Sequence, residues 1–146
     1  MGLMKFRAYD EDDKVMRSWE EIDFTKDIGD DYYLIGYKDS EVSIKYDHEQ
    51  IIMQYTGLKD KNGVEIYEGD IVKFDARSHY HPEVYAWEYE TKGIGIIRYE
   101  MGSYLLGGRE ESHILESLFG VIMNYEEVEM EVIGNIYENP ELLEEI

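Results

Sequence analysis

The order of elements that decides the fold begins with the stretch Glu68-Gly69-Asp70-Ile71-Val72-Lys73-Phe74. Its first three residues predict a tight turn, because glycine accepts the positive φ that many turns require. The next four predict a strand, with Val72 and Phe74 on one face and Lys73 on the other. A polar loop over residues 76–83 and a hairpin of residues 84–89 and 93–99 follow. This order is typical of an SH3-like barrel.

Short strand patterns lie on both sides of this stretch. We expect strands at residues 4–9, 15–16, 32–37, 42–46 and 51–58 before it, and at 104–106 and 126–137 after it, the last being the longest. An apolar stripe predicts a helix at residues 111–119, and Asn139 with Pro140 predicts a capped final helical turn. The fold class is therefore mainly β: a small antiparallel, SH3-like barrel or curled sheet, with N-terminal strand hairpins and one or two short helices.

The length of 146 residues fits a single domain over residues 1–146. A subdivision into N-terminal hairpins at 4–56 and a barrel-like core at 57–140 fits the strand pattern.

Composition excludes several classes of protein. Fourteen Lys and Arg stand against 34 Asp and Glu, and a net charge of −20 repels nucleic acid. The chain has no cysteine, which excludes disulfides and thiolate chemistry. No apolar run approaches the roughly 20 residues of a membrane span, and no signal peptide is visible. We expect a cytoplasmic protein that binds neither nucleic acid nor membrane.

Catalytic and metal sites have weak signals. His79 and His81 are two residues apart and Glu83 continues the line, so on a strand all three would share one face. Such a set could hold zinc or iron. It lies in a predicted polar loop, however, and we expect no catalytic residue, metal or cofactor. A metal-dependent enzyme at the His79/His81 loop stays open as a second alternative.

Two groups of residues are candidates for a protein interface. Tyr85, Trp87 and Tyr89 alternate, so a strand would present them on one face as a binding stripe or as part of the core. Ile133, Ile136 and Tyr137 make both faces of one segment apolar, so we expect it to be covered on both sides.

An acidic row precedes that segment. Glu127, Glu129 and Glu131 alternate with apolar residues and would share one face of the strand. With the other C-terminal glutamates they could imitate the charge of DNA and occupy a basic host protein, which is the first alternative function.

Three stretches resemble the YopX family of bacteriophage and prophage proteins. They are Lys5-Phe6-Arg7-Ala8-Tyr9-Asp10, the long motif from Met53 to Gly63 with Glu65 to Val72, and Val132 to Leu143. The family often has Trp at the position of Tyr9. The resemblance implies an accessory protein of unknown biochemical role that self-associates as a trimer or larger ring. It brings no catalytic residues and no cofactor.

Most of the motif is interpreted as structural. Turn chemistry explains Asn62, Gly63, Glu68, Gly69 and Asp70. Gly57 and Gly134 interrupt strand patterns, where glycine marks a bulge or a close backbone approach. Gln54, Tyr55 and Thr56 predict a hydrogen-bond network or a binding patch. We expect a non-enzymatic homo-oligomer that binds a host or phage protein.

Overall fold

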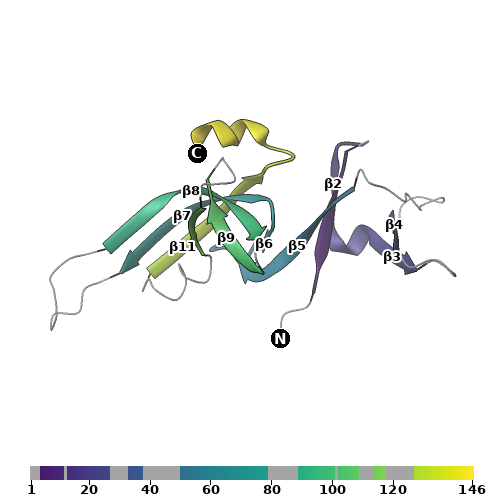
Figure 1. Cartoon of the computed structure of the whole chain (residues 1–146), viewed down its shortest axis with the longest axis horizontal. Coiled ribbons are helices and arrows are strands. Elements are labelled where there is room, and N and C mark those ends of the chain that lie inside the picture. The colour runs from purple at the N-terminus through teal and green to yellow at the C-terminus, as the bar shows by residue number, and fades with distance from the viewer. Residues whose placement is uncertain are drawn as a thin grey trace. The chain divides into compact units, whose positions relative to one another are not determined.

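The computed structural model describes residues 4–11, 13–26, 33–37, 50–78, 89–100, 102–108, 114–117 and 127–146. Antiparallel strands dominate these ranges, which confirms the mainly β fold class (Figure 1). The chain divides into two compact units, Met1–Tyr55 and Thr56–Ile146. This division falls beside the expected boundary at residues 56 and 57, while the assignment of both units to one domain stays a prediction.

The first unit contains two sets of paired strands. β1 (Phe6–Asp10) pairs with β2 (Val15–Arg17) on one side and with the start of β5 (Gln50–Lys59) on the other. A 3-10 turn, Trp19–Glu21, leads into β3 (Ile22–Lys26), which pairs with β4 (Tyr33–Tyr37). The strands expected near residues 4–9, 15–16, 32–37 and 51–58 are confirmed. The strand expected at 42–46 lies outside the described residues.

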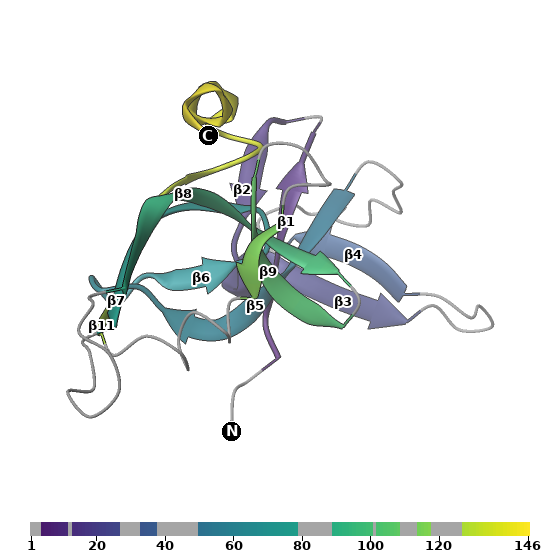
Figure 2. The same cartoon turned by 60° about the vertical axis from the view of Figure 1, so that its left-hand side comes forward.

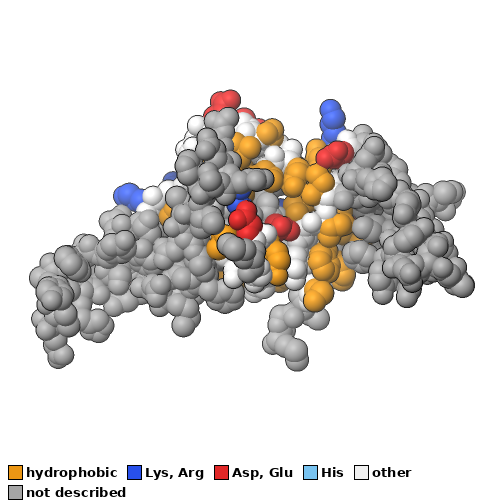
Figure 3. All heavy atoms as spheres, in the orientation of Figure 1, with side chains coloured by type: hydrophobic (Ala, Val, Ile, Leu, Met, Phe, Trp, Pro, Cys, Tyr) orange, Lys and Arg blue, Asp and Glu red, His pale blue; other side chains and the backbone are white. Residues whose placement is uncertain are grey.

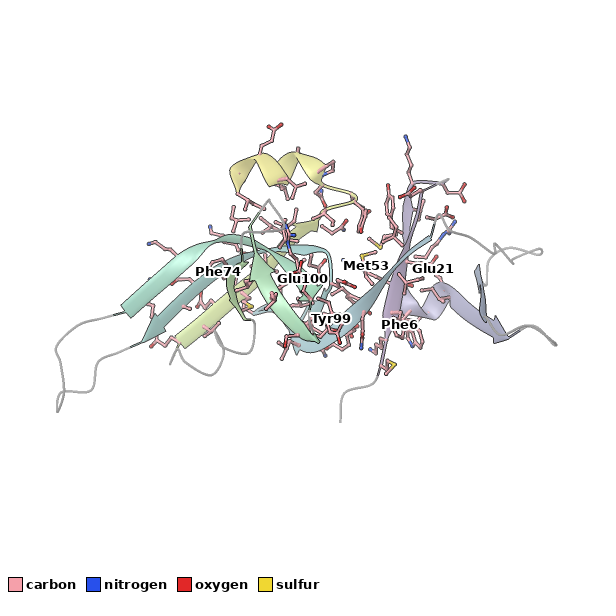
Figure 4. All side chains as sticks on the ribbon, viewed as in Figure 1. Phe6, Glu21, Met53, Phe74, Tyr99 and Glu100 are labelled. Carbon is pink, nitrogen blue, oxygen red and sulfur yellow. The ribbon has the colours of Figure 1, made fainter. Side chains whose placement is uncertain are left out.

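The described residues of the first unit include a buried apolar cluster. Ala8 and Ile22 are buried, with Ile52 packed against them. Met53 is also buried, and the rings of Phe6 and Trp19 lie 6.0 Å apart (Figure 4). The alternating residues of β1 therefore behave as a half-buried strand should.

The second unit is built on a five-stranded antiparallel sheet. Its order is β10 (Ile114–Ser117), β9 (Ser103–Gly107), β8 (Tyr89–Glu100), β7 (Asp70–Ser78) and β11 (Glu127–Asn135). The end of β5 lies beside β6 (Glu65–Tyr67), and β8 bends strongly along its length (Figure 2). One core joins β6 to this sheet, through buried Ile66, Val72, Phe74, Ala76, Ile97, Leu106 and Met130. The unit is a curled half-barrel, as expected.

The expected hairpin has its second strand, residues 93–99, within β8, but the turn expected before it at residues 91–93 is wrong. β8 runs without a break from Tyr89 to Glu100 and pairs with β7 along that length. Gly93 is not a turn residue but stands opposite Phe74, whose ring would be 3.5 Å from a Cβ at that position. The expected loop at 76–83 begins too early, because β7 continues to Ser78 and Ala76 is buried. β8 is also longer than β11, which ends at Asn135.

The helix expected at residues 111–119 is wrong where the structure describes it. Residues Ile114–Ser117 form β10, which pairs with β9 through an irregular register. A short apolar run is compatible with either structure, and pairing with a neighbouring strand decided it.

The final helical turn is confirmed as a 3-10 helix, Pro140–Glu145, with Pro140 in its first turn. Asn139 does not cap it through its side chain. The Asn139 Oδ1 atom instead accepts a hydrogen bond from the backbone N–H of Asn135, 3.2 Å away.

Candidate functional site

Asp60 lies in the long family motif that begins at Met53. It is 7% exposed, and its Oδ1 atom accepts hydrogen bonds from the backbone N–H groups of Asn62 (2.8 Å) and Val64 (2.9 Å). Its Oδ2 atom accepts one from the N–H of Val132 in β11, 2.9 Å away. One carboxylate thus shapes the turn after β5 and ties it to β11. Gly63, with a φ of 83°, completes the predicted turn.

The charge of Asp60 is stabilised in this position. Burial raises the pKa of its carboxyl, but the backbone N–H groups of Val132, Val64 and Asn62 and the charge of Lys61 outweigh burial. The net result is a pKa below the ordinary value of 3.8. Asp60 is therefore an ionised structural acceptor.

The turn at Glu68, Gly69 and Asp70 joins two other segments. Gly69, with a φ of 85°, donates its N–H to the Ile97 carbonyl (2.8 Å) and accepts from the Ile136 N–H (3.0 Å). The buried Asp70 accepts the Tyr67 N–H at 2.7 Å. The predicted turn is confirmed, and it also holds the chain that follows β11.

The end of β11 contains the close approach predicted at Gly134. The β7–β11 register shifts between Val132 and Gly134. A Cβ on Gly134 would lie 2.6 Å from Asn139 Oδ1 and 2.9 Å from Leu142 Cδ1. Buried Asn135 accepts the N–H groups of Tyr137 and Glu138 through its Oδ1 atom. These contacts fold the last residues against the strand.

The segment Gln54–Gly57 has mixed roles. The Thr56 hydroxyl donates to the Ile66 carbonyl at 2.7 Å and accepts the Leu58 N–H at 3.2 Å, so it supports the β5–β6 pair. Gly57 has a φ of 87°. Lys5 Nζ lies 5.5 Å from the centre of the Tyr55 ring, and Gln54 pairs with Phe6 in the ladder. Thr56 thus makes hydrogen bonds of the kind predicted for this segment.

The candidate interface residues are only partly described. Ile133, Ile136 and Tyr137 are each partly buried, so the covering expected on both faces is incomplete. Tyr85 and Trp87 lie outside the described residues, as do His79, His81 and Glu83. The backbone of Tyr89 begins β8, but its side chain is outside the described part.

The acidic row on β11 faces charges of both signs. Across the ladder Glu127 stands opposite Arg77, Glu129 opposite Asp75, and Glu131 opposite Lys73. Lys61 Nζ lies 3.6 Å from Glu131 Oε2, and Arg77 Nη2 lies 3.3 Å from Asp75 Oδ2. The face shown in Figure 3 carries both acidic and basic side chains among the described residues. Cations therefore interrupt the row.

Comparisons with known proteins decide the family. The model of the YopX protein family matches residues 5–144. The chain belongs to the YopX family. Among solved structures, it is similar to protein EF1440 from Enterococcus faecalis, at 29% identity and a TM-score of 0.59, over 98% of this chain and 99% of that one. A comparison with curated proteins found no match.

Sequence reasoning about this YopX protein missed an aromatic pair at the end of β8. Tyr99 is 47% exposed, and its ring centre lies 4.9 Å from that of Tyr104 on β9 (Figure 4). Burial, then Glu68 and Tyr99, raise the pKa of the Tyr104 hydroxyl. Gly102, with a φ of 78° between the two strands, was the available signal for this hairpin.

Two absences among the described residues concern membranes and metals. None of the helices in the described ranges is long and apolar enough to cross a membrane. Among the described residues, no group of three or more His, Cys, Asp and Glu is placed to hold a metal ion.

Proposed function

We propose that this YopX protein is a non-enzymatic accessory protein of a bacteriophage or prophage. It acts in the bacterial cytoplasm by self-association and by binding another protein, from the host or the phage. The family match supports the accessory role and the self-association, because the resemblance implies accessory proteins that self-associate.

One observation supports a binding role over a catalytic one. Polar side chains in the second and third family stretches hold the chain in place: Asp60 accepts three backbone N–H groups, and Asp70 and Asn135 accept others. A general acid or base needs an atom that can exchange a proton with a bound substrate, within hydrogen-bond reach of it. The motifs thus support a scaffold that presents surfaces.

The segment after β11 is the proposed self-association surface. Ile133, Ile136 and Tyr137 follow the register shift in β11, and each keeps part of its side chain exposed. Partly exposed apolar side chains gathered in one segment are typical of subunit contacts. The Tyr85, Trp87 and Tyr89 stripe is the second part of this proposal.

Replacing Ile136 with aspartate should convert the oligomer, a trimer or larger, to a monomer or make the chain insoluble. An unpaired charge buried at a subunit contact costs several kcal/mol, and each 1.4 kcal/mol weakens association about tenfold. Light scattering after size-exclusion chromatography measures the mass directly. Far-UV circular dichroism shows whether the variant keeps its strands.

The matched control is Val64→Asp. Val64 is 47% exposed in the turn after Asp60, so a charge there should leave the mass unchanged. An Ile136→Asp chain that stays folded and keeps the wild-type oligomer would contradict the proposal, as would a wild-type chain that is monomeric at every concentration.

The two alternatives gain no support from the described residues. DNA mimicry needs a regular array of carboxylates, and Lys61, Lys73 and Arg77 interrupt the row on β11. The metal-dependent enzyme depends on His79 and His81, which lie outside the described part.

A further inference from the structure

β11 is an edge strand whose outer side is only partly covered. Among the described strands, its only neighbour in the sheet is β7. On its other side the Met130 carbonyl accepts the Lys61 N–H at 2.9 Å, and the Val132 N–H donates to Asp60 at 2.9 Å. These two contacts cover the second half of the strand.

The first half of β11 has an open edge at Val128. Backbone groups alternate in direction along a strand, so the N–H and C=O of Val128 point the same way as the outward groups of Met130 and Val132. Within the described ranges, neither group of Val128 has a hydrogen-bond partner. Unpaired edge groups of this kind are a template for pairing with another extended chain.

A hollow of about 260 Å³ lies beside this open edge. Its lining is mainly apolar and comes from Leu58, Ile66, Val128 and Met130, with Lys59, Asp60 and Lys61 at one side. The four apolar residues belong to the core of the half-barrel or pack against it. Since a cavity of about 150 Å³ holds a benzene molecule, this open hollow has room for one or two apolar side chains.

The opposite face of the same stretch is acidic. Glu127 and Glu129 are exposed, and a second hollow of about 490 Å³ is lined by Asp75, Arg77, Glu127, Val128 and Glu129. Glu129 stands across from Asp75, and like charges in that position repel. Arg77 forms an ion pair with Asp75, whereas Glu129 has no ion pair with any described residue. A cation supplied by a partner would relieve this repulsion.

We propose that residues 127–130 of β11 are a docking edge for an extended segment of a partner protein in which apolar and basic residues alternate. The segment adds a strand to the sheet through the Val128 N–H and C=O. Successive side chains of a strand point to opposite faces, so the apolar ones enter the hollow beside Leu58 and Ile66. The basic ones then lie over Glu127 and Glu129. This inference rests on the proposed binding function and names the partner's chemistry.

Charge argues against a second copy of this chain as the occupant. Pairing two β11 edges would bring Glu127 and Glu129 of one copy beside the same residues of the other. Each chain also carries a net charge of −20, which opposes such pairing and attracts a basic segment. The proposed self-association uses the later residues 133–137 and leaves this edge open.

Peptide titration of the full chain tests the docking edge. The probe is a blocked peptide of about seven residues, a common strand length, in which lysine and valine alternate. A second peptide has the same composition with its lysines and valines in separate blocks. We expect the alternating peptide to bind at least about tenfold more tightly by calorimetry, and to slow hydrogen exchange at the Val128 amide.

Two variants of equal charge sharpen the test. Glu129→Lys and Glu144→Lys both change the net charge by two, and both residues are exposed, but Glu144 lies in the C-terminal 3-10 helix. Glu129→Lys should weaken binding about tenfold, while Glu144→Lys should change it less than about twofold. Val128→Pro removes an N–H that points away from β7, so no hydrogen bond of the β7–β11 ladder is lost. This variant should also weaken binding, provided that circular dichroism shows a folded chain.

The outcomes separate this inference from the proposed function. Equal binding of both peptides, or equal effects of the two lysine variants, would mean attraction by overall charge and would overturn the docking edge. A Val128→Pro chain that loses its oligomeric state would also overturn it, because the edge would then join copies of the chain. If the peptide does not bind while Ile136→Asp still gives a monomer, the inference fails and the proposed function stands.

Discussion

Replacing Asp60 with alanine should lower the free energy of unfolding by about 3–4 kcal/mol. The substitution leaves three backbone N–H groups, those of Asn62, Val64 and Val132, without their acceptor. Each hydrogen bond to a charged group contributes about 1.5–3 kcal/mol. Asn62 and Val64 are exposed, however, so water can accept their N–H groups in the variant and the loss stays below the sum of three bonds. Urea unfolding followed by tryptophan fluorescence or circular dichroism measures the loss.

The matched control for this prediction is Asp13→Ala. The Asp13 side chain is 58% exposed and lies 3.2 Å from Arg17 in an ordinary surface ion pair. Such pairs contribute about 0–1 kcal/mol. If the two alanine variants lose equal stability, Asp60 does not tie the turn to β11.

The contribution of Asp60 should depend on pH with a definite sign. The native pKa lies below the ordinary 3.8, so the folded state favours the ionised form and the unfolded state binds the proton more readily. The stabilisation is fully present above the unfolded value and declines as pH falls through 3.8 toward the lower native pKa. The difference in unfolding free energy between wild type and Asp60→Asn should therefore shrink in that range. A difference that stays constant down to pH 3 would contradict this account.

Replacing Gly134 with alanine should lower the free energy of unfolding by about 2 kcal/mol. The new Cβ would lie 2.6 Å from Asn139 Oδ1, 2.8 Å from Asn139 Cγ and 2.9 Å from Leu142 Cδ1. Asn139 cannot turn aside freely, because its Oδ1 atom accepts the Asn135 N–H. Overpacking of this kind costs about 1–3 kcal/mol. Faster hydrogen exchange after residue 135 should accompany the loss measured by urea unfolding.

Gly93→Ala is the control for that experiment. Gly93 also lies in a strand, but its Cβ would meet nothing nearer than Phe74 Cζ at 3.5 Å, an ordinary contact. This variant should be neutral or more stable by up to about 1 kcal/mol, because alanine restricts the unfolded chain. A Gly134→Ala chain as stable as Gly93→Ala would show that the C-terminal segment yields without cost.

Local patterns predicted the strands and turns that local chemistry controls. The alternation in β1 and β11 and the glycine turns at Gly63 and Gly69 were recognised because each depends on a few neighbouring residues. The close approach at Gly134 was also predicted, since glycine interrupts an otherwise apolar strand.

The parts that failed depend on distant residues. The structure at Ile114–Ser117 depends on pairing with β9, and the continuity of β8 through Gly93 depends on pairing with β7, where Phe74 stands opposite. Asp60 bonds to Val132, 72 residues later, which no short window reveals. The open edge at Val128 could not be predicted either, because it depends on which strands pair. Asn62 and Gly63 predicted the turn itself, and only the long-range bond of Asp60 was hidden.

The pairing of β11 with β7 also determines the order in which the sheet can form during synthesis of the chain. Asp70 of β7 pairs with Asn135, so the two strands are far apart in the growing chain. When β5, β6 and β7 have left the ribosome, Val72 and Phe74 are exposed, because Met130 of the same core has not yet been synthesised. Contacts of such separation form slowly. Until β11 has been synthesised, the apolar face of the incomplete sheet therefore stays uncovered. During that time the acidic charge of the chain opposes aggregation.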